Sequence, residues 1–196
     1  FGGSDVMHRI SYDGLYQGEL RKAVVNALNH EIMAMAEQMG FVRQEIYEVV
    51  VAGNSTMRDI FFRLDVQEIG QKPYKSITEH EYLAGERETT SLILSTRRIG
   101  LRANPKARVY GLPLIASHVG GDVAADLMSI DMASQPGVTM LVDVGTNAEI
   151  VLGNRERLLA TSSPTGPAFE GAQISCGQRA APGAVERVRI DRKTLE

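Results

Sequence analysis

Three short apolar segments between residues 138 and 163 constrain the fold more than any other part of the sequence. Each has the length of a strand, and the turns between them are Gly145-Thr146-Asn147 and Gly153-Asn154. A glycine–asparagine pair between apolar runs is a common signal for a β-hairpin. The sequence therefore predicts three consecutive antiparallel strands, at 138–142, 148–152 and 158–161.

A strand of a different kind is predicted upstream, at residues 46–52. Nearly every position is apolar and valine is frequent, which is typical of a strand buried on both faces, as in a parallel sheet. Asn54 or Ser55 follows in a position to cap a helix with apolar positions at 57, 60, 61 and 64. A parallel strand–helix unit followed by antiparallel strands indicates a mixed sheet of the α/β class.

Two further helices are predicted from spacing. Residues 19–39 carry apolar side chains three and four apart, and Gly40 is placed to end the helix. Met35 and Met39 belong to this stripe and are expected to face the core. Residues 114–128 also have helical spacing but include Gly120 and Gly121. Two glycines in a helix cost about 1 kcal/mol each relative to alanine, so we expect another segment to approach this backbone closely. Residues 65–113 are less regular, with short apolar pieces between prolines and glycines, and Val109-Tyr110 is a candidate short strand. We assign no chemistry to this segment.

Composition excludes several classes of protein. The 196 residues have a formal net charge of −3, with 43% hydrophobic and 23% charged residues, which is typical of a folded globular protein and not of a disordered tail. There is no basic excess to favour nucleic acid and no apolar run of about 18–20 residues to span a membrane. The single cysteine, Cys176, excludes an intrachain disulfide and any four-cysteine metal site held by this chain alone. The cytoplasm is the expected compartment.

The turn after the first of the three strands is the sharpest candidate for chemistry. Asp143 ends a strand and is followed by a glycine, a hydroxyl and an amide. Glycine lets backbone N–H groups approach phosphate oxygens, and a carboxylate can hold Mg²⁺ directly or through water. The alternative is an ordinary hairpin with a solvated aspartate, and spacing alone does not choose between the two.

The surrounding order of motifs resembles the actin, sugar kinase and heat-shock chaperone superfamily of ATPases. In that superfamily a helix of small residues crosses between two lobes and precedes a strand–Asp-x-Gly-Thr–strand phosphate turn, the order found at 116–128 and 141–153. The resemblance implies that Gly120, Gly121 and Ala124 allow the helix to pack against a counterpart. The Gly-Thr-Asn turn differs from the Gly-Gly-Gly-Thr of the chaperones.

Six ordered motifs narrow the resemblance to the ATP-dependent reductive activators of corrinoid proteins. They run from Phe1 to about Ala184, with the weakest match at 65–113. The first two each carry one residue more than the family's pattern. The matching segments are FGGSDVMHRI (1–10), VVAGNSTM (50–57), HVGGD (118–122), DVGTNAEIVL (143–152), GPAFEGA (166–172) and ISCG (174–177).

The resemblance implies an α/β fold of the actin-like, ribonuclease H-like two-lobed ATPase type, incomplete at both ends. Residues 1–113 would form the back part of the first lobe with an irregular connecting segment, and 114–196 the crossing helix and first half of the second lobe. Such activators use ATP, and electrons from a ferredoxin-like 2Fe–2S domain, to return Co(II) corrinoid proteins of methyltransferase systems to Co(I). We therefore expect ATP and Mg²⁺ as cofactors, the cluster in the parent protein only, and a corrinoid protein as partner. A homodimer is compatible with the sequence, and the chain alone is expected to be inactive and to bind ATP weakly.

The resemblance also implies a set of site residues. Asp143 would bind the metal and act in catalysis, and Glu170 would orient water or metal. Gly145, Thr146, Asn147 and Gly166 would contact the nucleotide. Gly166 precedes a predicted short helix whose N-terminus would face phosphate, and the alternative is a capped surface helix in which Glu170 offsets the helix dipole.

Two other residues receive structural interpretations, and three rival functions are kept. His118 is expected to be a structural histidine of the crossing helix, and Cys176 a buried small hydrophobe. One rival is a sugar kinase, for which no sugar-binding motif is visible. Another is an activator of 2-hydroxyacyl-CoA dehydratases, whose bridging cluster needs more cysteines than one. The third is a non-catalytic lobe that binds a corrinoid protein.

Overall fold

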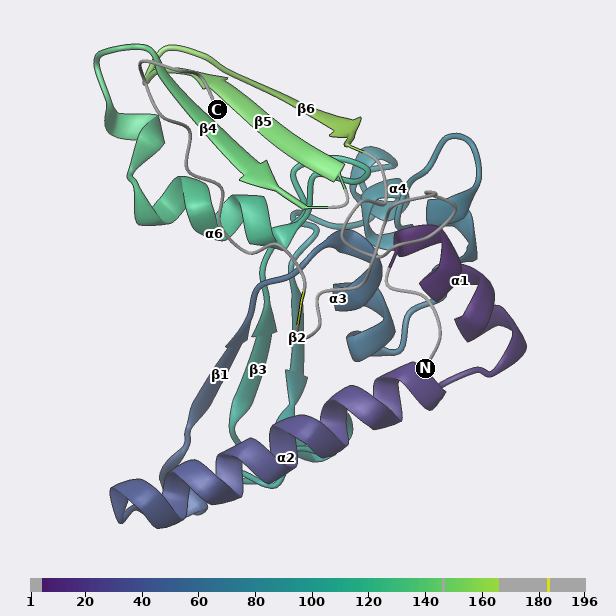
Figure 1. The fold of residues 1–196 in the computed structure, drawn as a ribbon, viewed down its shortest axis with the longest axis vertical. Coiled ribbons are helices and arrows are strands. Elements are labelled where there is room, and N and C mark those ends of the chain that lie inside the picture. The colour runs from purple at the N-terminus through teal and green to yellow at the C-terminus, as the bar shows by residue number, and fades with distance from the viewer. Residues whose placement is uncertain (1–4, 146, 166–182, 184–196) are drawn as a thin grey trace.

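The computed structural model describes residues 5–145, 147–165 and 183, arranged as two three-stranded sheets with helices packed against them (Figure 1). The helices are α1 (Val6–Leu15), α2 (Glu19–Met39), α3 (Ser55–Phe62), α4 (Ile77–Leu83), α5 (Thr96–Ile99) and α6 (Gly121–Ser129). The strands are β1 (Glu48–Val51), β2 (Leu92–Ser95), β3 (Arg108–Gly111), β4 (Thr139–Val144), β5 (Asn147–Gly153) and β6 (Leu158–Pro164). Short 3₁₀ turns lie at Arg43–Glu45, Gln67–Gly70 and Met132–Ser134.

The first sheet has the order β1-β3-β2, with β1 parallel and β2 antiparallel to the central β3. Its core joins Val25 and Ile32 of α2, Phe61 and Phe62 of α3, and Val109 of β3. The less regular stretch at 65–113 therefore supplies two of these strands, β2 and β3. The predicted short strand at Val109 is confirmed.

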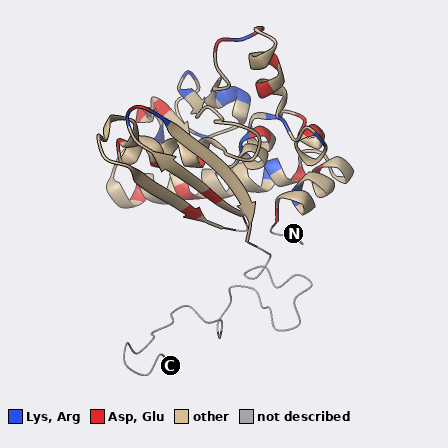
Figure 2. Cartoon of the chain, turned by 90° about the horizontal axis from the view of Figure 1, so that it is seen from above, with Lys and Arg blue, Asp and Glu red and all other residues tan. Residues whose placement is uncertain are grey.

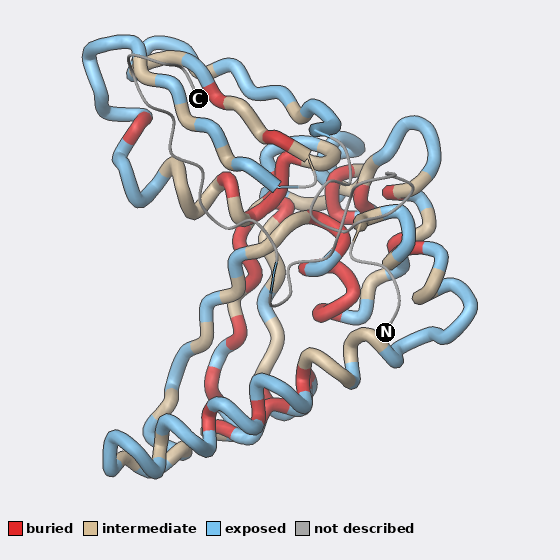
Figure 3. The backbone as a smooth tube through the Cα atoms, in the orientation of Figure 1, coloured by how far each residue is buried: buried red, intermediate tan, exposed pale blue. Residues whose placement is uncertain are grey.

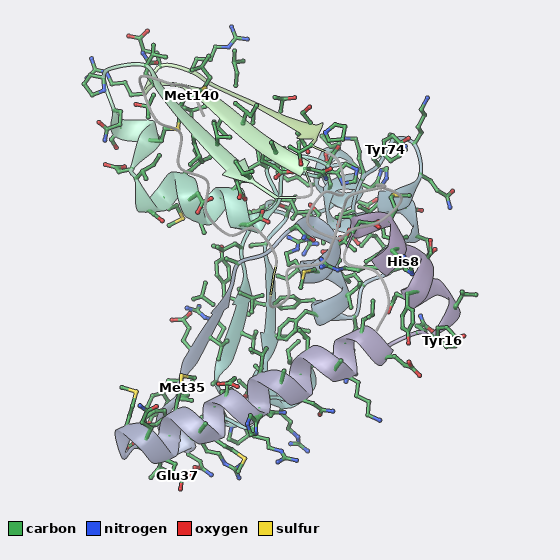
Figure 4. The ribbon with its side chains drawn as sticks, in the orientation of Figure 1. His8, Tyr16, Met35, Glu37, Tyr74 and Met140 are labelled. Carbon is green, nitrogen blue, oxygen red and sulfur yellow. The ribbon has the colours of Figure 1, made fainter. Side chains whose placement is uncertain are left out.

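Helix α2 begins and ends as predicted, with Gly40 as its C-cap at φ 70°, but its apolar stripe is only partly buried. The residues that face the core are Val25, Asn29 and Ile32, whereas Met35 and Met39 are 44% and 73% exposed. The expectation that both methionines belong to the core is wrong, because the last turns of α2 extend past the strands (Figures 1 and 4). Asn29 is accommodated because it donates to Gly100 O at 3.0 Å and accepts from Arg102 N at 2.6 Å.

The sequence predicts that strand β1 is buried on both faces. This prediction is wrong, because only one face of β1 is covered. It pairs with β3 alone among the described strands. Val49 and Val51 pack against the first core, while Val50 on the opposite face is 59% exposed. An edge strand with one covered face accounts for this alternation, since successive side chains point to opposite sides of a sheet.

The second sheet confirms the three predicted antiparallel strands, in the order β4-β5-β6. Helix α6 covers one face of it, and Val123, Met132 and Val151 are buried between them. Buried stretches concentrate along β3 and where α3 meets the start of α6 (Figure 3). The two sheets are therefore connected through α3 and α6.

Helix α6 is shorter than the helix predicted over 114–128. It begins at Gly121 with Gly120 as its N-cap, and residues 114–119 form a turn in which Ser117 has a φ of 46°. The two glycines thus stand at a helix start and do not interrupt a helix. His118 lies in the turn and not in the helix.

Charged residues of both signs occur throughout the described part of the chain. In Figure 2, Lys and Arg positions are interspersed with Asp and Glu positions along the ribbon. Within the same described part, no helix is both long and apolar enough to cross a membrane.

Candidate functional site

The start of α3 is fixed by a predicted cap. Asn54 has extended backbone angles, and its side-chain oxygen accepts from the backbone N–H of Met57 at 2.9 Å. Ser55 Oγ donates to Ser117 O at 2.6 Å, which ties the first residue of α3 to the turn before α6. The helix ends at Phe62 with Arg63 as C-cap, so Leu64 lies beyond it. The Gly-Asn-Ser-Thr segment is therefore a rigid loop-to-helix corner.

The start of α6 lies directly against this corner. Gly53 O accepts from Gly121 N at 3.0 Å and from Asp122 N at 3.3 Å. A Cβ on Gly120 would lie 2.7 Å from Asn54 Cα and 2.8 Å from Ser55 N, distances that real Cβ atoms essentially never show. The close approach expected at these glycines is present, and the segment that approaches is the β1–α3 corner.

The turn between β4 and β5 brings carboxylates to the same place. Asp143 and Glu149 are paired across the two strands, and Gly145 N donates to Asn147 O at 2.8 Å to close the turn. Ser162 Oγ of β6 donates to Glu149 at 2.8 Å, and Thr165 Oγ1 donates to Gly145 O at 2.7 Å. The carboxylates are thus held on a sheet and not on a free loop.

These elements enclose a cavity of about 150 Å³. It lies between the N-terminal ends of α1, α3 and α6 and the β4–β5 turn. Its lining residues are Val6, Arg9, Asn54, Ser55, Thr56, His118, Asp122, Asp143, Gly145, Asn147 and Glu149. Tyr74, whose ring centroid lies 5.9 Å from that of His118, marks this side of the molecule in Figure 4, far from Met35 and Glu37 on α2.

Three carboxylates line the cavity: Asp122 from the first turn of α6, and Asp143 and Glu149 from β4 and β5. Burial raises the pKa of Asp122, and repulsion from Asp143 adds to the effect. Burial also raises the pKa of Glu149, with the charges of Asp122 and Asp143 acting in the same direction. Because like charges disfavour one another's ionised forms, a cation in the cavity would be stabilised by all three groups.

His118 lines the cavity as a half-buried side chain. Burial lowers its pKa, and the nearby Glu79 opposes this shift in part. Glu79 is itself buried, accepts from Ser117 N at 2.8 Å and pairs with Lys75 at 2.7 Å. The imidazole is therefore favoured in its neutral form beside the cavity.

The sequence-based site is brought together where the structure describes it. Asp143, Gly145 and Asn147 all line the cavity. Thr146, Gly166 and Glu170 lie outside the described residues, as does Cys176. The roles assigned to all six site residues stay predictions.

Sequence reasoning missed several of the lining residues. Asp122 and Glu149 stand inside quoted motifs, but no role was given to them. Arg9 and Thr56 were likewise part of motifs at 1–10 and 50–57 and received no role. The signal that could have found them is that polar residues in four separate motifs must converge if the motifs share one site.

The donor set suits a hard divalent cation held with the help of a ligand. In the described part of the chain, no three His, Cys, Asp or Glu side chains are already arranged to hold a metal ion. Mg²⁺ commonly uses one or two carboxylates and completes its shell with water and phosphate oxygens. Asp143, with Asp122 and Glu149 nearby, fits that mode.

Two family models match the chain in succession. The model of the RACo middle region covers residues 2–135, and that of the C-terminal domain of RACo, the ASKHA domain, covers residues 137–196. The first alone spans more than half of the chain.

Two individual relatives match most of the chain. The corrinoid activation enzyme RamQ of Eubacterium limosum is 31% identical over 191 residues, 96% of this chain and 30% of that protein. The Co(II) methylated amine-specific corrinoid protein reductase of Methanosarcina barkeri is 26% identical over 165 residues, 79% of this chain and 28% of that protein.

A solved structure supports the same conclusion. A reductive activator for a corrinoid, iron–sulfur protein superposes with a TM-score of 0.75 at 36% identity, covering 96% of this chain and 29% of that one. The chain thus spans less than a third of the length of these relatives. With two consecutive family models and this structural match, the chain belongs to the RACo family and has its α/β, actin-like fold.

Proposed function

We propose that this chain is the part of an ATP-dependent reductive activator that holds the phosphate end of ATP, and that its parent protein returns Co(II) corrinoid proteins to Co(I). One observation carries the proposal: segments from four family motifs, far apart in sequence, meet at one cavity lined by three carboxylates and by the N-terminal residues of α1, α3 and α6. The names of the relatives supply the corrinoid substrate.

Each described side chain has a task in this proposal. Asp143 would hold Mg²⁺, directly or through water, with Asp122 and Glu149 adding negative charge. Bound Mg²⁺ would neutralise charge on the phosphates. Gly145 and Asn147 would shape the turn that contacts phosphate, with Thr146. Gly166 and Glu170 are proposed as further members on the family resemblance alone.

The remaining parts of the proposal lie outside this chain. A one-electron reduction of Co(II) to Co(I) needs an electron donor, and one cysteine does not provide the four thiolates of a 2Fe–2S cluster. We therefore place the cluster in another part of the parent protein, which would act on a corrinoid protein of a methyltransferase system in the cytoplasm. Residues 1–113 and 114–196 are proposed as parts of its first and second ATPase lobes.

The test is Asp143→Asn in the full-length protein. We expect ATP hydrolysis and ATP-dependent corrinoid reduction to fall about 100-fold or more, the scale of losing one preorganised electrostatic group, while reduction of the cluster by an external donor is unchanged. The matched control is Asp131→Asn at the far end of α6, where φ is 48° and asparagine is well tolerated. If the Asp143 variant hydrolyses ATP at the wild-type rate, the β4–β5 turn is only a structural hairpin and the proposed role of Asp143 is wrong.

A further inference from the structure

The N-terminus of α3 offers hydrogen-bond donors that the described residues do not use. The first four N–H groups of a helix have no intrahelical partner. Here the Asn54 side chain satisfies one of them by accepting from Met57 N at 2.9 Å, and the Asn54 carbonyl accepts the first intrahelical bond, from Arg58 N at 3.0 Å. Among the described residues, the N–H groups of Ser55 and Thr56 have no partner.

The hydroxyl of Thr56 is a second and independent sign of a missing ligand. Thr56 is 1% exposed and lines the cavity. Within the described part of the chain, its Oγ1 is the one buried side-chain oxygen or nitrogen without a hydrogen-bond partner. The equally buried neighbour Ser55 is satisfied by Ser117 O at 2.6 Å. An unpaired buried hydroxyl costs about 1–3 kcal/mol, so its place in a cavity wall calls for a partner supplied from outside.

A cation on α1 faces the same cavity. Arg9 lines it from the first turns of α1, and within the described residues its guanidinium has no ion pair or hydrogen bond, although its backbone N–H donates to Asp5 O at 3.1 Å. Buried or half-buried guanidinium groups are usually paired, and phosphate oxygens suit their planar array of donors. Arg9 and the start of α3 thus bring several hydrogen-bond donors to a cavity that three carboxylates also line.

We propose that Thr56, the N-terminus of α3 and Arg9 form an oxyanion site that takes a phosphate group, in the cavity that the carboxylates of Asp122, Asp143 and Glu149 also line. The inference deepens the proposed function, on which its choice of ligand rests. The phosphate would be the terminal group of ATP or the inorganic phosphate released from it, and the two share this chemistry. A cation held by the carboxylates offsets their repulsion of the phosphate, so binding is expected to require Mg²⁺.

The test compares three ligands with Mg²⁺ present: ATP, ADP and inorganic phosphate. Calorimetric titrations of the full-length protein would use the wild type, Thr56→Val, Thr56→Ser and the control Thr139→Val, at the far end of β4 from Asp143. We expect Thr56→Val to weaken ATP and inorganic phosphate about tenfold or more, the effect of losing a hydrogen bond to a charged group, and to leave ADP within twofold. Thr56→Ser should bind as the wild type does.

The apo protein gives a readout that separates a ligand site from a structural hydroxyl. Removing an unpaired buried hydroxyl should leave the unfolding temperature of unliganded Thr56→Val equal to the wild type's or higher, so that weak binding is not a folding defect. Unchanged affinity for ATP and phosphate in Thr56→Val, or equal losses for ATP and ADP, would overturn the site. If the wild type binds phosphate in a Thr56-dependent way but not ATP, the proposed function fails and the oxyanion site stands.

Discussion

Replacing Gly120 by alanine tests whether α6 starts against the β1–α3 corner. The new methyl carbon would lie 2.7 Å from Asn54 Cα and 2.8 Å from Ser55 N. Both are backbone atoms that Asn54's cap and Gly53's carbonyl hold in place. Since no flexible side chain can turn away, either α6 or the start of α3 must move.

The expected cost follows from two opposing terms. Overpacking of this kind typically costs about 1–3 kcal/mol, whereas restricting the unfolded chain by Gly→Ala stabilises by about 0.4–1 kcal/mol. The net loss in the free energy of unfolding is therefore about 0–2.6 kcal/mol, centred near 1.3 kcal/mol. For a domain of this size, each kcal/mol corresponds to about 2–4 °C in unfolding temperature.

Urea unfolding and thermal unfolding measure this loss, with Gly137→Ala as the control. A Cβ on Gly137 meets nothing within 4 Å, so that variant should be as stable as the wild type or slightly more stable. Phosphate binding should weaken in Gly120→Ala and stay unchanged in Gly137→Ala. Only the first substitution displaces the contact between Gly120 and the β1–α3 corner, and Asp122 and Thr56 lie on either side of that contact. Equal stabilisation of both variants would show that α6 does not start against the corner.

Two further substitutions are expected to change the free energy of unfolding in opposite directions. Arg58→Ala should lower the free energy of unfolding, measured in urea, by about 3–5 kcal/mol. The fully buried guanidinium pairs with Asp59 at 2.7 Å and donates to Thr90 O at 2.8 Å, so its removal leaves an uncompensated buried charge. Wild-type stability of this variant would contradict these contacts. Asp122→Asn should instead stabilise the protein near neutral pH while reducing ATP hydrolysis. Because the pKa of Asp122 is raised in the folded state, the folded state binds more protons than the unfolded state between the unfolded and the folded pKa. The wild type therefore loses stability as the pH rises from the ordinary aspartate pKa through the raised pKa. Unfolding at about pH 4 and pH 8 should show the larger advantage of the variant at pH 8, and an equal difference at both values would contradict this.

Local signals account for the parts of the fold that the sequence predicted. The limits of α2, its Gly40 cap, the Asn54 cap of α3 and the strands at 139–164 all depend on residues close together in the chain. The start of α6 was mispredicted because helical spacing continues through 114–119. The helix starts later, at Gly121, where the N–H groups of Gly121 and Asp122 donate to the carbonyl of the distant Gly53.

Burial was the less predictable property. Val50 has the same residue type as Val49 and Val51, but nothing in a run of valines shows that the strand lies at a sheet edge. Met35 and Met39 continue a regular apolar stripe, and only the length of the strands beneath α2 leaves them exposed. Both outcomes depend on contacts between distant segments.

Some residues of the candidate site could be predicted from their neighbours in sequence, and others are found only from contacts between distant segments. Asp143 could be found because a carboxylate, a glycine and a polar turn stand together in the sequence. Asp122, Glu149 and Thr56 belong to the site only through the packing of α3, α6 and β5. The unpaired state of the Thr56 hydroxyl, in particular, is visible only when all of its neighbours are placed.

The central claim is that this cavity holds the phosphate end of ATP with its metal. A crystal structure of the full-length protein with Mg²⁺ and a non-hydrolysable ATP analogue tests it most directly. The account predicts the terminal phosphate within hydrogen-bond distance of Thr56 Oγ1 and the backbone N–H of Thr56, with Mg²⁺ bound by Asp143 directly or through one water. Phosphates bound elsewhere, with this cavity filled only by water, would contradict it.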